Sequence, residues 1–209
     1  MRHGQTAWNL EGRAQGHADI PLDETGLEQA RALAAGFEPG CPINKVYTSD
    51  LQRASQTAAV LADRLQADLI VRNELRERSF GDFEGEIFAN FGPKLEQIAL
   101  EQGIPQMNVT PPNGETWQVV WSRLDAFLEM LDSSDDHSVA VTHGGTGSLL
   151  MAKLVQGTLE TARSFSFGNT GIMELERRPD GFYKIIRYND TSHLGRSAVL
   201  SGSVEGSTR

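Results

Sequence analysis

Two histidines lie in similar short motifs at distant places in the chain. Residues 2–4 read Arg-His-Gly, and residues 142–145 read Thr-His-Gly-Gly. The glycine after each histidine allows a sharp turn or a close approach to a ligand. A neutral imidazole, with an ordinary pKa of about 6.5, is a nucleophile at neutral pH, and an adjacent guanidinium grips phosphate oxygens with paired hydrogen bonds. The two motifs therefore indicate one active site that handles a phosphoryl group.

The charge balance restricts the partners of this chain. Its 28 acidic and 19 basic residues give a net charge of −9 at pH 7. Nucleic acids and anionic membranes favour broad cationic surfaces, so we expect neither as a partner. A local cationic pocket can still form where Arg2, His3, Arg53 and His143 converge. We therefore expect a small phosphorylated metabolite as the partner, while the oligomeric state is not indicated by the sequence.

A zinc site is the chemical alternative for the same residues. His3, His143 and Glu77 are side-chain types that ligate zinc. Arg2 and Arg53 would oppose a cation among them, and the chain has neither a His-x-x-x-His pair nor a cluster of cysteines. We expect no metal and no cofactor.

The elements that must position these residues alternate between helix and strand. Apolar spacing predicts helices over 25–37, 51–65, 91–101, 116–131 and 146–155, strands over 45–48, 69–71 and 138–141, and a hairpin of 172–175 and 182–188. Residues 5–24 show little periodicity and are expected to form a long loop. The alternation predicts an α/β fold, a three-layer α/β/α sandwich with a mostly parallel central sheet, in which both histidine motifs follow strand ends.

The length and composition indicate one catalytic domain. The 209 residues are 39% hydrophobic and 22% charged, which are ordinary values for a globular protein. We expect a single catalytic domain over 1–196, with a small cap insertion over about 81–115 and a disordered tail over 197–209. The start is polar, no apolar run approaches a membrane span of roughly 20 residues, and Cys41 is the only cysteine, so we expect a cytoplasmic location.

Further residues extend the two histidine motifs over nearly the whole chain. They are, in order, Gln5-Thr6, Asn9, Gln15-Gly16, Arg53, Leu75-Arg76-Glu77, Gly81, Glu84-Gly85, Gly114-Glu115-Thr116 and His193-Leu194. With Arg2-His3-Gly4 and His143-Gly144-Gly145, this set resembles the histidine phosphatase superfamily, the phosphoglycerate mutase-like proteins.

The resemblance implies a reaction through a phosphohistidine. His3 would attack phosphorus and carry the phosphoryl group until water removes it. Arg2 and Arg53 would hold the phosphate oxygens, and His143, protonated beside the dianion, would add a third positive donor. Uncatalysed hydrolysis of phosphate monoesters is so slow that enzymes supply accelerations of up to roughly 10²¹, which makes such charge stabilisation necessary.

Other roles also rest on the resemblance. Asn9 and Gln15 would donate hydrogen bonds to the phosphate, and Gly16 and Gly144 would let the backbone come close. Glu77 is the best candidate for the general acid that protonates the leaving alkoxide and then activates water. Three other carboxylates, those of Asp82, Glu84 and Glu86, lie near it in sequence. His17, His137 and His193 are expected to be structural.

Three departures from the family pattern bear on the function. Relatives carry a hydrophobic strand before Arg-His-Gly, so we expect residues upstream of Met1 in the native chain. The segment between Gly85 and Gly114 is short for a mutase, and no arginine follows His143 closely. We therefore expect a metal-independent phosphomonoesterase. A cofactor-dependent phosphoglycerate mutase and a non-catalytic phosphate-binding regulatory protein are the alternatives.

Overall fold

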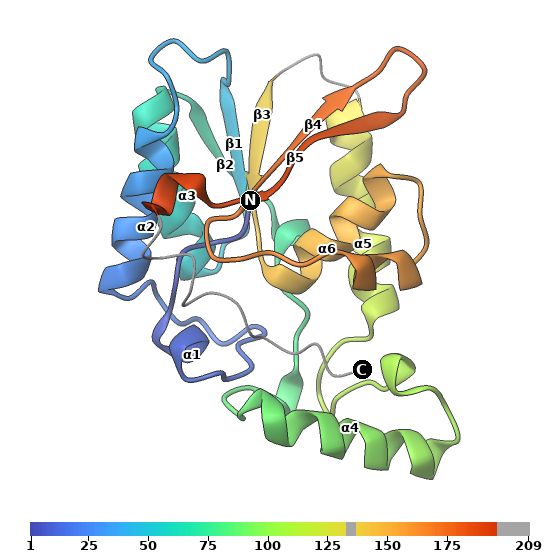
Figure 1. Ribbon diagram of the computed structural model, residues 1–209. Helices are drawn as coiled ribbons and strands as arrows, with labels where there is room; N and C mark the ends of the chain where they lie inside the picture. The colour runs from blue at the N-terminus through green and yellow to red at the C-terminus, as the bar shows by residue number, and fades with distance from the viewer. Residues whose placement is uncertain (133–136, 196–209) are drawn as a thin grey trace.

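A short parallel sheet lies at the centre of the computed structural model, which describes residues 1–132 and 137–195. Strand β1 (Lys45–Thr48) lies between β2 (Asp68–Val71) and β3 (Ser138–Val141), and both neighbours run parallel to it (Figure 1). Because β1 and β3 are paired in register, Thr48 lies opposite Val141. The residues that follow these strands therefore emerge side by side.

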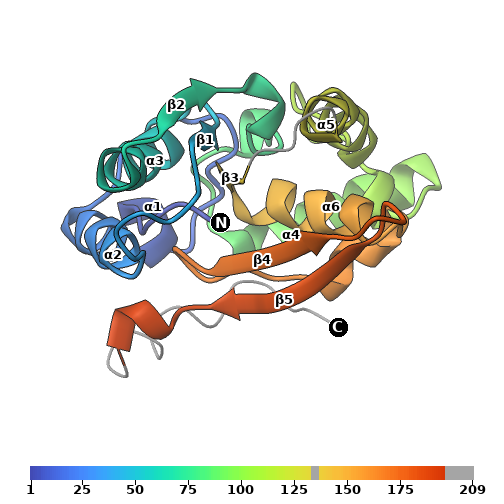
Figure 2. The ribbon, with the colours of Figure 1, turned by 90° about the horizontal axis from the view of Figure 1, so that it is seen from above.

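Helices cover both faces of this sheet. Helices α2 (Glu24–Ala35) and α3 (Gln52–Leu65) lie on one side, and α5 (Trp117–Asp132) lies on the other, next to α6 (Gly144–Leu154) (Figure 2). Val46, Val139 and Val141 pack with the alanines of α3, whereas Tyr47 packs with α5 and α6. Alternate residues of β1 thus point to opposite faces, as strand geometry requires. The predicted three-layer α/β/α fold is confirmed.

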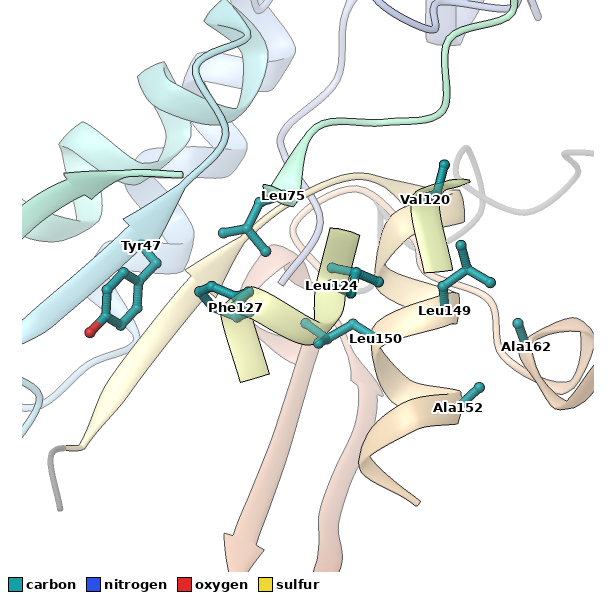
Figure 3. Packing of buried hydrophobic residues seen from close by; sticks show 9 residues of the cluster. All are labelled: Tyr47, Leu75, Val120, Leu124, Phe127, Leu149, Leu150, Ala152 and Ala162. Atoms are coloured by element: carbon teal, nitrogen blue, oxygen red, sulfur yellow. The ribbon is translucent and has the colours of Figure 1, made fainter. Parts of the chain in front are cut away.

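The larger core cluster joins α5 and α6 to the sheet. Figure 3 shows its buried side chains, among them Leu124 and Phe127 of α5 and Leu149 of α6. The rings of Phe127 and Tyr47 meet edge to face with centroids 5.5 Å apart, an arrangement that aromatic pairs prefer. This packing fixes α6, and with it the His143 motif that precedes the helix, against the sheet.

The segment expected to form a cap contains one long helix and a core of its own. Helix α4 (Phe88–Gln102) begins three residues before the expected 91–101 and lies beyond the carboxyl ends of the strands (Figure 1). Phe80, Phe83 and Phe91 are buried with Leu95 of this helix in a separate apolar cluster. These phenylalanines therefore pack the cap.

The region 5–24 differs from the expected loop because it contains a short helix. Helix α1 (Ala7–Leu10) begins at Thr6, whose side chain accepts the backbone N–H of Asn9, while the Asn9 side chain accepts the backbone N–H of Thr6. This reciprocal pair is a capping box, which stabilises a helix start through local hydrogen bonds. Such a helix leaves no apolar periodicity in the sequence.

The remaining elements complete the description of the chain. Strands β4 (Ile172–Arg177) and β5 (Tyr183–Asp190) form the predicted antiparallel hairpin, and both are longer than expected. The 3₁₀ helices are Asn73–Leu75, Gly81–Phe83, Gln106–Asn108, Glu160–Ser164 and Ser192–Leu194. The expected tail, 197–209, lies outside the described residues. Within the described part of the chain, no helix is both long and apolar enough to span a membrane.

Candidate active site

The start of the chain pairs with the end of β3 and so joins the two histidine motifs. Arg2 forms a parallel bridge with Thr142, and the His3 N–H donates to the Thr142 carbonyl at 3.0 Å. The ring centroids of His3 and His143 are consequently 5.2 Å apart. The two motifs therefore share one site, at the carboxyl end of the parallel sheet, where α/β folds commonly place their ligands.

The His3 side chain is held in the tautomer that a nucleophile requires. Its Nδ1 lies 2.6 Å from the Gly4 carbonyl oxygen, which can only accept, so Nδ1 carries the proton. Nε2 then presents a lone pair, and no residue in the described ranges bonds to it. The ring is buried, and its pKa lies well below 6.5 because of burial first and then the nearby Arg53 and Arg2 cations.

The His143 ring is held between a cation and a hydroxyl group. Arg53 Nε donates to Nδ1 at 3.1 Å, so Nε2 carries the proton and donates to Ser49 Oγ at 2.8 Å. Burial lowers the His143 pKa well below 6.5, and Arg53, His3 and Arg2 lower it further. The expectation of a third positive donor is therefore wrong for the site without ligand, where this histidine is neutral.

Arg53 is a buried cation with no carboxylate partner among the described residues. Besides His143, it donates from Nη1 to the Ala18 carbonyl at 2.8 Å and from Nη2 to the Gly16 carbonyl at 2.7 Å. Burial is the main cause that lowers the pKa of Arg53 to about 10, so the group stays charged at neutral pH. Arg2 extends the positive charge from the chain start and donates from Nη1 to the Phe167 carbonyl at 2.7 Å.

The loop around Gly16 supplies amide groups beside the cations. Asn9 Oδ1 accepts from Thr6, and Gln15 Oε1 accepts from the Thr6 hydroxyl at 3.0 Å. In the described part of the chain, neither amide nitrogen has a hydrogen-bond acceptor. Gly16 adopts φ +52°, and a Cβ there would lie 2.2 Å from the Glu84 carboxylate, so this position requires glycine.

Glu77 lies at the N-terminus of α6, immediately after the His143 motif. Its Oε1 accepts the backbone N–H groups of Arg78 at 2.9 Å and Thr146 at 3.0 Å, and the Thr146 hydroxyl at 3.2 Å. Its Oε2 accepts the Gly145 N–H at 2.9 Å. The partial positive charge of a helix N-terminus favours a carboxylate at this position. One continuous segment, 143–146, therefore contacts both Arg53 and Glu77.

The other carboxylates near Glu77 in sequence have different partners. Asp82 is exposed and accepts from the Asn113 side chain at 3.0 Å. Glu84 holds the Gly16 loop by accepting the His17 N–H at 2.8 Å, and Glu86 pairs with Lys94 at 2.5 Å. Glu77 is thus the carboxylate of this group that contacts the His143 segment.

The residues proposed as zinc ligands are occupied by other contacts. Both His143 nitrogens and both Glu77 oxygens have partners in the protein. No group of three or more potential metal ligands gathers anywhere in residues 1–132 and 137–195, leaving aside the masked side chains.

Two side chains at the site were missed in the sequence. Asn169 donates from its amide to the His3 carbonyl at 3.1 Å and to Asn9 Oδ1 at 3.3 Å, and Ser49 bonds to His143. Ser49 directly follows β1, a position that could have indicated it. Nothing in the local sequence distinguishes Asn169 from an ordinary turn residue.

The expected structural histidines lie around this site. His193 Nε2 bonds to the Thr170 hydroxyl at 3.0 Å, and the Thr170 N–H donates to the His3 carbonyl at 3.3 Å. His17 Nε2 donates to the Glu77 carbonyl at 2.8 Å. His137 is exposed at the start of β3, far along the strand from the motif.

Comparison with known proteins identifies the family of this chain. The model of the histidine phosphatase superfamily (branch 1) matches residues 1–191. The chain belongs to this superfamily. The predicted resemblance is therefore confirmed, and relatives named as phosphatases place the chain among the phosphoric monoester hydrolases.

Three similar proteins illustrate the range of this superfamily. A putative phosphoserine phosphatase of Hydrogenobacter thermophilus is 32% identical over 176 residues, which cover 84% of this chain and 86% of the relative. A probable phosphoglycerate mutase of Proteus mirabilis is 33% identical over 202 residues, 93% of each chain. The structure of a putative alpha-ribazole-5'-P phosphatase from Escherichia coli has a TM-score of 0.80 at 26% identity and covers 91% of this chain and 94% of that chain.

The buried neutral histidines predict a pH dependence of stability. The unfolded chain binds protons at His3 and His143 near pH 6.5, whereas their pKa values in the folded protein lie well below it. Stability is therefore lost as pH falls below 6.5, by about 1.4 kcal/mol per histidine for the first full pH unit. Urea unfolding in phosphate-free buffer at about pH 7.5 and about pH 5.5 should show a smaller loss in His143→Gln than in the wild type. His137→Gln serves as the control, and equal losses in all three proteins would contradict the buried neutral state.

Proposed function

We propose that this chain is a metal-independent phosphomonoesterase that forms a phosphohistidine on His3. The observation that carries the proposal is the free Nε2 lone pair of His3, which lies in a buried site rich in positive charge. A phosphoryl group brings two negative charges to a region where Arg53 has no carboxylate partner among the described residues. Paired guanidinium hydrogen bonds favour such a dianion.

The first step transfers the phosphoryl group to the protein. His3 Nε2 forms a bond to phosphorus, and the bond from phosphorus to the ester oxygen breaks. Arg2 and Arg53 neutralise charge on the three remaining oxygens, and the amide nitrogens of Asn9 and Gln15 donate to them. Glu77 donates a proton from Oε2 to the departing alkoxide, because Oε2 has fewer protein donors than Oε1.

The second step returns the protein to its starting state. Glu77, now a carboxylate, takes a proton from water while the water oxygen bonds to phosphorus and the bond from phosphorus to Nε2 breaks. Inorganic phosphate leaves, and the proton again lies on Glu77. Across both steps one water is consumed, and one alcohol and one phosphate are released. Gly16 and Gly144 leave room for the backbone to approach the phosphate.

The bound dianion changes the charge state of His143. A nearby negative charge raises a histidine pKa, opposing the effect of burial and of Arg53. If Arg53 Nε turns from His143 Nδ1 to a phosphate oxygen, Nδ1 becomes free to accept a proton. We propose that His143 becomes a positive donor only in the complex.

The substrate class is a small phosphorylated metabolite. The names of relatives refer to phosphoserine and alpha-ribazole phosphate, which are both esters of small alcohols. The two sizes of alcohol differ greatly, so these names alone do not select one substrate for this chain.

A phosphoglycerate mutase is the second candidate because a probable mutase is 33% identical over 93% of this chain. A mutase must keep water from the phosphohistidine while the intermediate reorients. The cap segment here consists of one helix and its flanking turns. With 3-phosphoglycerate as substrate, we expect inorganic phosphate and no 2-phosphoglycerate, measured by phosphate assay and by phosphorus NMR. Formation of the 2-isomer without net phosphate release would assign the mutase activity instead.

Replacement of His3 tests the nucleophile. His3→Ala should lose covalent phosphate labelling and reduce turnover of 4-nitrophenyl phosphate to background, because no other imidazole at the site presents a free nitrogen in the unliganded protein. His137→Ala should label and turn over like the wild type. Acid quenching followed by mass spectrometry measures the label, and normal labelling of His3→Ala would place the nucleophile elsewhere. All reactions contain EDTA, so loss of wild-type activity there would contradict metal independence.

Replacement of Glu77 tests the proton donor. Glu77→Gln should slow hydrolysis of an alkyl phosphate by about 10²- to 10⁴-fold, the usual contribution of general acid catalysis. Hydrolysis of 4-nitrophenyl phosphate should be slowed much less, since 4-nitrophenolate leaves without a proton. Steady-state rates for both esters provide the comparison, with exposed Glu28→Gln as the matched control. A uniform loss across both esters would count against the acid role.

A further inference from the structure

A second feature of the molecule is a cavity of about 510 Å³ beside the candidate active site. It lies between the cap, α5, α6 and the 3₁₀ helix Glu160–Ser164. Its walls are mainly apolar and include Leu95, Trp117, Leu149, Leu159 and Ala162. This size and character are typical of cavities that bind small organic molecules.

The cavity reaches the candidate proton donor through Gly145. Gly145 lines the cavity, and its N–H donates to Glu77 Oε2 at 2.9 Å. A Cβ at this position would lie 2.7 Å from Glu77 Oε1 and 2.8 Å from the Trp117 ring. Any side chain at 145 would therefore crowd the junction between Glu77 and the cavity. An alcohol oxygen that receives a proton from Glu77 has its carbon atoms directed toward this junction.

Two arginines line the cavity, and they differ in their contacts. Arg78 is buried over the Trp117 ring, at 4.5 Å, and donates to the Glu115 and Val109 carbonyls at 2.7 Å each. It forms part of a fixed wall between cap and core. Arg163 is exposed, and its guanidinium makes no hydrogen bond or ion pair within residues 1–132 and 137–195. The neighbouring Glu160 carboxylate accepts from the Thr158 hydroxyl instead, at 2.8 Å.

We propose that this cavity binds the leaving group of the substrate, and that Arg163 at its rim binds an anionic group on that alcohol. The inference rests on the proposed phosphatase function. It specifies a phosphate monoester of an elongated, mainly apolar or aromatic alcohol that carries a carboxylate or similar anion away from the ester. The apolar body contacts Leu95, Leu149 and Leu159, and the ester oxygen lies beside Glu77.

A pair of esters tests the anion site. Phenyl phosphate and 4-carboxyphenyl phosphate share an aromatic body and differ in the distal carboxylate. The ratio of their kcat/KM values is measured in the wild type, in Arg163→Gln and in Arg31→Gln, a matched removal of an exposed arginine on α2. We expect the preference for the carboxylate ester to fall about five- to tenfold in Arg163→Gln, a charged hydrogen bond at a partly exposed site. The phenyl phosphate rate and the Arg31→Gln ratio should be unchanged.

The outcomes separate this inference from the function on which it rests. An unchanged ratio in Arg163→Gln, with phenyl phosphate still hydrolysed, overturns the anion site and leaves the phosphatase proposal standing. If the wild type hydrolyses neither ester, the proposed function fails. Calorimetry with phenylphosphonate and 4-carboxyphenylphosphonate, which cannot be hydrolysed, then decides the anion site by binding alone. Equal affinities of the two phosphonates, or an equal difference in Arg163→Gln, would overturn it.

Discussion

The buried positive charge of Arg53 is the constraint on which the site depends. Removing a guanidinium from water is costly unless hydrogen bonds and an opposite charge compensate it. Here backbone carbonyls and a neutral histidine accept its hydrogen bonds, and no carboxylate of the described residues lies within salt-bridge distance. The hydrogen bonds satisfy the donors, but the charge stays uncompensated until an anion enters. A site of this kind selects a dianion inside a protein whose overall charge is −9.

The strand order explains how residues so distant in sequence meet around that charge. Strand β1 lies between β2 and β3, so Ser49 after β1 and His143 after β3 emerge as neighbours. Arg53 follows from the first turn of α3, which begins directly after Ser49 and its short connection. The two apolar cores on either face hold these strands in register. A one-residue slip of β3 would move His143 away from both partners, which makes the packing of the sheet a condition for the site.

The sequence predicted the elements that are specified locally and missed those that depend on tertiary contacts. Strands Lys45–Thr48 and Ser138–Val141 were predicted with the observed bounds, because compact apolar runs determine them. Helix α1 was missed because a capping box, and not an apolar face, stabilises it. Asn169 reaches His3 across 166 positions of the chain, a contact that no local pattern contains. The neutral state of His143 likewise follows from one contact with Arg53 Nε, which only the folded geometry establishes.

The N-terminus of α6 gives the proposed reaction its direction. Helix N-termini attract anions, and in many phosphate sites the phosphate itself occupies that position. Here the Glu77 carboxylate accepts the Gly145 and Thr146 N–H groups, so the phosphoryl group is favoured at the arginines and His3 instead. The proton donor and the cations therefore lie on different sides of the 143–146 segment. An ester that places its phosphate among the cations must direct its alcohol toward Glu77, and this arrangement determines which of its oxygens leaves.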